Sequence, residues 1–115
     1  MRILLIEDDT VLGAAVRDQI AADGHSVDWV MRLDAARDAM AGAAFDLVLL
    51  DPPFDAGLLA PAVAAASPLL APGGWLYVES GVPPAPVPAG LLPVKALQAG
   101  AVHAQLLRRA GDAPA

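Results

Sequence analysis

Short apolar runs alternate with helix-like segments over the first half of the chain. Residues 2–6, 26–30 and 46–50 are rich in branched apolar side chains, and runs of this length predict strands. Apolar residues at the spacing of one helix face fill the intervals between them. This β-α-β-α-β order favours parallel strands and right-handed crossovers, and it places the first strand beside the third.

Polar and glycine residues mark the ends of the two predicted helices. Thr10 is expected to cap the first helix, and Gly24 is expected to end it. Asp34 and Gly42 are expected to do the same for the second helix.

The second half predicts one more helix and an antiparallel hairpin. The expected elements are a helix over residues 57–66, a turn over 68–74, a strand over 75–79, a loop over 81–90 and hairpin arms over 92–97 and 101–107. Trp29 and Trp75 lie in predicted strands and are expected in the core, whereas Arg108 and Arg109 are expected to be solvated. We expect one α/β domain over residues 1–115, with a frayed tail over 110–115.

Composition narrows the classes of function. The net charge of −6 weighs against autonomous binding to nucleic acid, because a phosphate backbone repels an acidic surface. No apolar run is long enough to span a bilayer, so no membrane partner is expected. Cysteine is absent, and acidic residues stand where an export signal needs its cleavage region, so a cytoplasmic location is expected. The oligomeric state is open.

Carboxylates follow two of the predicted strands. Glu7 and Asp8 come directly after the first strand, and Asp51 comes directly after the third. If these strands are neighbours, the carboxylates converge at one edge of the sheet, where Mg²⁺ would relieve their repulsion. One of them is then able to act as a nucleophile toward a phosphoryl group. The alternative is that these acids only stabilise the N-termini of the helices that they precede.

Three motifs relate the first half to a known family. They are ILLIEDD at the first strand, DGHSVDWV at the second and FDLVLLD at the third. With them, residues 1–51 resemble the N-terminal half of a two-component response-regulator receiver domain, which has a flavodoxin-like fold. The resemblance implies that Glu7 and Asp8 bind Mg²⁺ together with Asp51, which would be the phosphoacceptor. It also implies a histidine kinase as partner in a phosphorelay.

The sequence departs from the receiver pattern after Asp51. Pro52 and Pro53 have no backbone N–H to offer a phosphoryl oxygen. Ser80 stands about where a receiver has its hydroxyl and is a candidate phosphoryl contact. Lys95 is the only lysine, and it comes too early for the receiver lysine and alternates as a solvated strand residue would. We therefore expect weak Mg²⁺ binding and slow or absent phosphorylation.

The second half carries the motifs DPPFDAGLL, LLAPGGWLYVES and LQAGAVHAQLLRR. With them, residues 45–109 resemble the C-terminal part of the bacterial small-subunit ribosomal RNA guanine-N2 methyltransferases, which are Rossmann-like and use S-adenosylmethionine. The resemblance implies that Asp51, Pro52, Pro53 and Phe54 would hold the exocyclic amine of a target base. Hydrogen bonds to the amine and stacking of the aromatic ring suit that role.

The cofactor site of such a methyltransferase is not expected here. That site needs a glycine-rich turn after the first strand, so that the backbone approaches the ligand closely. Residues 7–13 read EDDTVLG instead, with three acids at the point of approach. S-adenosylmethionine is therefore not an expected cofactor, and an enzymatic activity stays uncertain.

Both resembled folds pair the strand before Asp51 with the first strand, so the two halves are compatible. Joining them predicts a three-layer α/β sandwich with sheet order 2-1-3-4-6-5, parallel at the centre and antiparallel at one edge. The first hypothesis is a chimeric domain with an impaired receiver-like pocket of Glu7, Asp8, Asp51 and Ser80. The alternatives are a methyltransferase remnant without its cofactor motif, and a natural or engineered fold chimera with no activity of its own.

Overall fold

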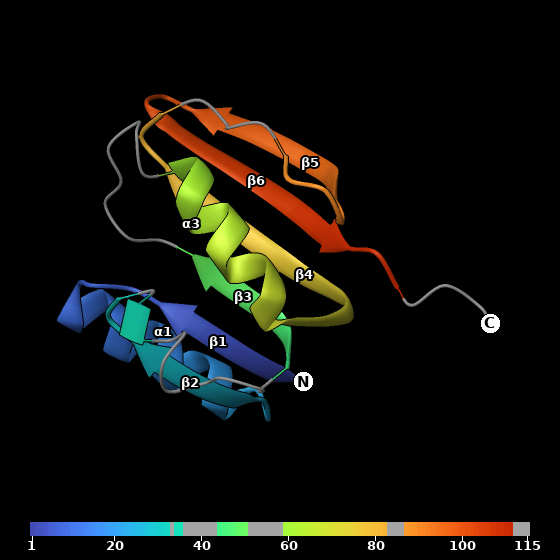
Figure 1. Cartoon of the computed structure of the whole chain (residues 1–115). Helices are drawn as coiled ribbons and strands as arrows, with labels where there is room; N and C mark the ends of the chain where they lie inside the picture. Colours follow the sequence, from blue (N-terminus) through green and yellow to red (C-terminus); the bar gives the residue numbers. More distant parts are fainter. Residues whose placement is uncertain (33, 36–43, 51–58, 83–86, 112–115) are drawn as a thin grey trace.

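The computed structural model describes residues 1–32, 34–35, 44–50, 59–82 and 87–111. Its elements are β1 (Arg2–Ile6), α1 (Thr10–Ala22), β2 (Ser26–Val30), β3 (Phe45–Leu50), α3 (Leu59–Ala66), a 3₁₀ turn (Ser67–Leu69), β4 (Leu70–Ser80), β5 (Leu91–Ala99) and β6 (Val102–Arg109). The strands form a six-stranded sheet in the order β2-β1-β3-β4-β6-β5 (Figure 1). The sheet is parallel from β2 to β4 and antiparallel at β6 and β5, which confirms the predicted fold class and strand order.

Alternate residues of the strands form the main core on the face that α3 covers. Its buried strand residues include Leu4 and Ile6 in β1, Val48 and Leu50 in β3, Leu76 and Val78 in β4, and Leu107 in β6. The helix contributes Leu59, Ala62, Val63 and Ala66 to the same cluster. The small side chains of Ala62 and Ala66 let α3 lie close to the sheet. The apolar runs of β1 and β3 explain why the sequence pattern identified these strands.

Helix α1 packs on the opposite face, against β1 and β2 (Figure 1). Its buried Gly13 lies against the indole of Trp29, whose backbone position is in register with Leu5 of β1. The predicted cap was wrong by one residue, because Asp9 is the N-cap and Thr10 is the first helical residue. Gly24 follows the C-cap with a φ of +90°, a conformation that favours glycine, as predicted for the end of this helix.

Strand β4 begins earlier than the pattern predicted. Leu70 already pairs with Phe45, and the ladder is irregular before Trp75, so residues 70–74 belong to the strand rather than to a turn. Gly74 is required by close approach, since a Cβ there would lie 3.0 Å from the carbonyl oxygen of Phe45. The backbone can pass this point only without a side chain.

The arginines at the end of β6 are not simply solvated, contrary to expectation. The guanidinium of Arg109 donates to the carbonyl oxygen of Leu70, and Nε of Arg108 donates to that of Gly73 at 3.4 Å. Arg108 also lies over the ring of Trp75, 4.9 Å from its centroid. Both tryptophans were expected in the core, but Trp75 and Trp29 are only half-buried and neither belongs to the main core.

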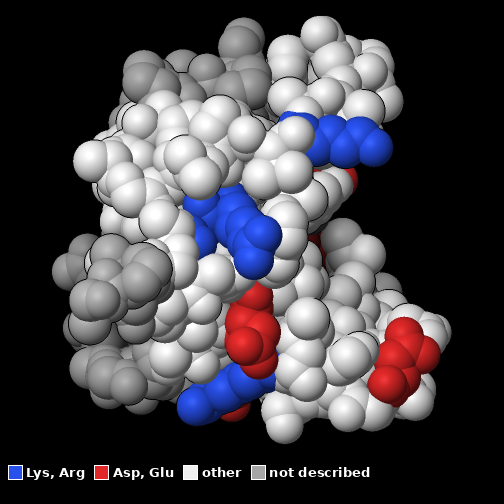
Figure 2. Space-filling model, turned by 90° about the vertical axis from the view of Figure 1, so that its right-hand side faces the viewer, with Lys and Arg blue, Asp and Glu red and all other residues white. Residues whose placement is uncertain are grey.

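Apolar side chains remain exposed at the antiparallel end of the sheet. Leu97 of β5 is 61% exposed and Val102 of β6 is 46% exposed. Figure 2 shows the molecule hollowed between the part that holds β5 and β6 and the part that holds α1. On the face shown there, the described basic residues form separate small groups rather than one continuous basic surface. None of the described helices is long and apolar enough to cross a membrane.

Candidate functional site

Glu7 is the only charged residue that is buried in the described part of the chain, with 4% of its surface exposed. It directly follows β1, and its backbone N–H donates to the carbonyl oxygen of Val30 in β2 at 3.1 Å. Its own carbonyl oxygen accepts from Nε1 of Trp29 at 2.9 Å, and its Oε1 accepts from the backbone N–H of Asp9 at 3.0 Å. Glu7 is therefore held at the carboxyl end of β1 by three bonds, two through its peptide groups and one through its carboxylate.

The next two acids, Asp8 and Asp9, differ in role: Asp9 caps a helix, and Asp8 is free to bind a ligand. Oδ1 of Asp9 accepts from the backbone N–H groups of Val11 and Leu12, each at 2.9 Å, and so caps α1. Asp8 is exposed, and no described residue donates to its carboxylate or forms an ion pair with it. Among the acids that follow β1, the capping role thus belongs to Asp9, which leaves Asp8 and one oxygen of Glu7 open to a ligand.

Strand register aligns the ends of β1 and β3. Ile6, the last residue of β1, lies opposite Leu50, the last residue of β3. Parallel pairing puts both carboxyl ends at the same edge of the sheet, where ligands bind in open α/β folds. The predicted phosphoacceptor Asp51 and the predicted base-binding residues Pro52, Pro53 and Phe54 lie outside the described residues.

Ser80 ends β4, on the far side of β3 from β1. Its hydroxyl donates to the carbonyl oxygen of Val82 at 2.8 Å and accepts from the N–H of the same residue at 3.3 Å. Val78 lies level with the last residues of β1 and β3, so Ser80 stands two residues further along β4 and two strand spacings, about 10 Å, to the side of β1. The hydroxyl is at the expected edge but is engaged in a local turn.

Lys95 lies on the edge strand β5, as expected of a residue on a solvated strand. Two strands, β4 and β6, separate β5 from β3, which corresponds to roughly 14 Å between β5 and β3. Lys95 is therefore not part of the edge that holds Glu7 and Asp8. Within the described ranges, which leave out Asp51, no group of three His, Cys, Asp or Glu side chains is arranged to hold a metal ion.

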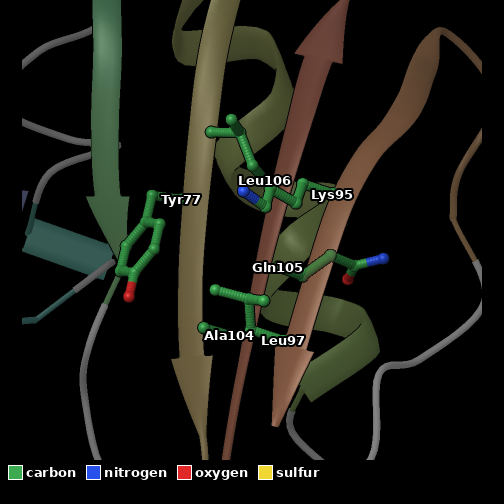
Figure 3. A pocket seen from close by; sticks show the side chains of 6 residues that line it. All are labelled: Tyr77, Lys95, Leu97, Ala104, Gln105 and Leu106. Carbon is green, nitrogen blue, oxygen red and sulfur yellow. The ribbon is translucent and has the colours of Figure 1, made fainter.

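A small hollow lies at the other end of the sheet (Figure 3). It is lined by Tyr77, Lys95, Leu97, Ala104, Gln105 and Leu106, and its volume is about 120 Å³. The surface that lines the hollow is almost entirely apolar. In Figure 3 the side chain of Gln105 points away from the hollow. Ligand pockets typically start near 300 Å³, so we assign no cofactor to this hollow.

Comparisons with known proteins point to two families. No family model matches the chain. It is 41% identical over 51 residues to the transcriptional regulatory protein QseB of Escherichia coli O157:H7, and 45% identical over 51 residues to the response regulator PmrA of Pseudomonas aeruginosa. These matches cover 44% of this chain and 23% of each relative, so the chain spans about a quarter of the length of these proteins.

Several solved structures that resemble the chain are described as methyltransferases or methylases. The putative methyltransferase yhhF of Escherichia coli superposes with a TM-score of 0.66 and 28% identity over 95% of this chain and 63% of that one. The putative methylase HI0767 of Haemophilus influenzae gives a TM-score of 0.66 at 21% identity, over 95% of this chain and 73% of that one. The rRNA methyltransferase aviRa of Streptomyces viridochromogenes superposes with a TM-score of 0.52 at 19% identity, over 83% of this chain and 44% of that one. The last two likenesses concern the fold alone.

The chain thus combines sequence similarity to response regulators with the fold of Rossmann-like methyltransferases. The length of the response-regulator match equals that of the predicted receiver-like half, residues 1–51. The methyltransferase-like architecture extends over nearly the whole chain, because the central β1–β3 pairing suits both folds. The chimeric character inferred from the motifs is confirmed.

Two residues of this region were not identified as site residues from sequence. Asp9 was grouped with the other acids, although its capping bonds give it a separate role. Trp29 was assigned to the core, whereas its indole N–H binds the backbone of Glu7. The only sequence signal for the second contact was the position of Trp29 in the strand expected beside Glu7.

Proposed function

We propose that the chain carries a receiver-like acidic pocket in which Glu7 and Asp8 bind Mg²⁺ and Asp51 accepts a phosphoryl group. The observation that carries this proposal is the register of Ile6 with Leu50, because Glu7 and Asp51 follow these two residues in the sequence. The burial of Glu7 and the open carboxylate of Asp8 support it, since hard oxygen ligands with few other donors suit Mg²⁺.

The chemistry of such a pocket would be phosphoryl transfer. The bound cation would neutralise charge on the transferring oxygens. A carboxylate oxygen of Asp51 would attack the phosphorus of a phosphohistidine on a partner kinase. The P–N bond would break, and an acyl phosphate would form on Asp51 while the histidine takes up a proton. The similarity to QseB and PmrA supports a histidine kinase as the partner class.

The surroundings favour a slow reaction. The hydroxyl of Ser80 already bonds to Val82 and would have to rotate to reach a phosphoryl oxygen. Lys95 is on the distant edge strand, so no lysine reaches the pocket from the described part of the sheet. Pro52 and Pro53 offer no N–H to the phosphoryl group. We propose that this chain still binds Mg²⁺ but accepts a phosphoryl group only slowly.

Calorimetric titration with Mg²⁺ tests the pocket. The Glu7→Gln, Asp8→Asn double variant is expected to lose the heat of binding that the parent shows. The matched control is the Asp18→Asn, Asp23→Asn double variant, which removes the same charge from exposed positions on α1 and at its C-cap and is expected to bind like the parent. Equal Mg²⁺ affinity in the parent and in the Glu7, Asp8 variant would refute the site.

A methyltransferase remnant is the second candidate. The likeness to yhhF over 95% of the chain favours it, and Asp51 to Phe54 would then contact the target base. The capped start of α1 weighs against a methyl-donor site, because Asp9 occupies its N–H groups and Glu7 adds a buried charge beside it. Binding of S-adenosylmethionine at micromolar affinity, measured by calorimetry, would favour this candidate. A folded chain that binds neither ligand would favour a chimera without activity.

A further inference from the structure

We propose that Trp29 is a positioning residue for Glu7 and that its indole N–H reports cation binding at the acidic pocket. The inference rests on the proposed Mg²⁺ site, because it assigns a role toward that site to a residue outside it. Trp29 lies on β2, and the two residues are 22 positions apart in the sequence.

Strand β2 holds the peptide groups of Glu7 from both sides. Val30 accepts the N–H of Glu7 at 3.1 Å, and Nε1 of Trp29 donates to the carbonyl oxygen of Glu7 at 2.9 Å. Glu7 lies just beyond the last residue of β1, where the regular ladder of the sheet has ended. The side chain of Trp29 therefore supplies a bond that the backbone of β2 no longer supplies.

The indole itself is fixed by its neighbours. One side of the ring lies against Gly13 of α1, where an added Cβ would come within 2.5 Å of Cε2 and 2.9 Å of Nε1. The guanidinium of Arg17 lies over the ring, 5.3 Å from its centroid. A ring confined in this way directs its N–H at one acceptor and restricts the backbone of Glu7, whose carboxylate in turn accepts from Asp9.

The position of the Glu7 carboxylate is expected to determine how tightly Mg²⁺ binds. Mg²⁺ demands near-ideal octahedral coordination, so it tolerates small displacements of a carboxylate poorly. Partners that orient a ligand from outside the coordination sphere typically change metal affinity 10- to 100-fold when they are removed. Trp29 touches neither the cation nor the phosphoryl group in this arrangement, and its effect passes entirely through Glu7.

The test compares the parent with Trp29→Phe, which keeps an aromatic ring and removes the N–H. We expect the Mg²⁺ dissociation constant of this variant to rise about 10-fold. In ¹H–¹⁵N spectra of the parent, the indole signal of Trp29 is expected to shift with Mg²⁺, at the same midpoint as the amides of Glu7 and Asp8. Trp75→Phe is the matched control, because Trp75 lies on β4 under Arg108 and is expected to leave Mg²⁺ affinity unchanged.

The outcomes separate the two proposals. Parental Mg²⁺ affinity in Trp29→Phe, together with an indole signal that does not respond to Mg²⁺, would overturn the role of Trp29 and leave the pocket intact. Amides of Glu7 and Asp8 that ignore Mg²⁺ in the parent would overturn the pocket and this inference with it. If Trp29→Phe fails to fold, the indole signal of the parent decides alone.

Discussion

The contact between α1 and β2 makes Gly13→Ala a sensitive test of the packing around Trp29. In an isolated helix this change is favourable, since alanine stabilises a helix interior by about 1 kcal/mol over glycine. Here the added methyl group would overlap the Trp29 ring, within 2.5 Å of Cε2 and closer still to Cζ2. The indole cannot move aside freely, because it is bonded to Glu7 and covered by Arg17.

The expected magnitude follows from three contributions. Overpacking a fitted contact typically costs about 1–3 kcal/mol. Displacing the indole would also weaken its hydrogen bond to Glu7, which contributes roughly 1 kcal/mol. After subtraction of the gain in helix propensity, Gly13→Ala is expected to lower the free energy of unfolding by about 1–3 kcal/mol. This corresponds to a fall in Tm of roughly 4–12 °C.

Urea unfolding followed by circular dichroism measures this change, with two controls. Ala15→Gly at an exposed position of the same helix is expected to cost about 1 kcal/mol and sets the propensity scale. In a Trp29→Val background, where the ring is gone, Gly13→Ala is expected to become stabilising. A stabilisation by Gly13→Ala in the parent would refute the packing of Trp29 on Gly13.

Three further changes test other parts of the fold by urea unfolding. Asp9→Ala is expected to cost about 1 kcal/mol, because it removes the cap of α1, whereas Thr10→Ala should change stability by only a few tenths; equal effects would contradict the cap. Leu76→Ala removes a fully buried side chain and is expected to cost about 2–5 kcal/mol, and a cost below 1 would contradict its place in the core. Arg109→Met should cost about 1 kcal/mol through the lost bond to Leu70, and an unchanged stability would contradict that contact.

The sheet was largely predictable from sequence because its central strands are continuous apolar runs. Residues 3–6 are buried on both faces, and in β3 Val48 and Leu50 are buried while Leu47 and Leu49 are half-buried; the apolar runs record this burial. The order of all six strands followed once each half was matched to a family whose fold pairs β1 with β3. The early start of β4 escaped prediction because residues 70–74 contain a proline and two glycines, which is typical of a turn.

The contacts of the site were less predictable because they join residues far apart in the chain. Trp29 and Glu7 are 22 positions apart, and Arg109 and Leu70 are 39 apart, so no local pattern records either bond. The choice between Asp9 and Thr10 as cap also escaped the pattern, since both residue types are good caps and only the end of β1 decides between them. The position of Glu7, in contrast, followed directly from its place after a strand.

The most direct test of the acidic pocket is a ¹H–¹⁵N correlation spectrum with Mg²⁺ titrated in, followed by beryllofluoride as a mimic of the phosphoryl group. We expect Mg²⁺ to shift the amides of Glu7 and Asp8, and beryllofluoride to add shifts at Asp51 and Ser80 only when Mg²⁺ is present. A well-dispersed spectrum that ignores both additions would contradict the pocket and show that the fold survived the joining of its two halves without the chemistry.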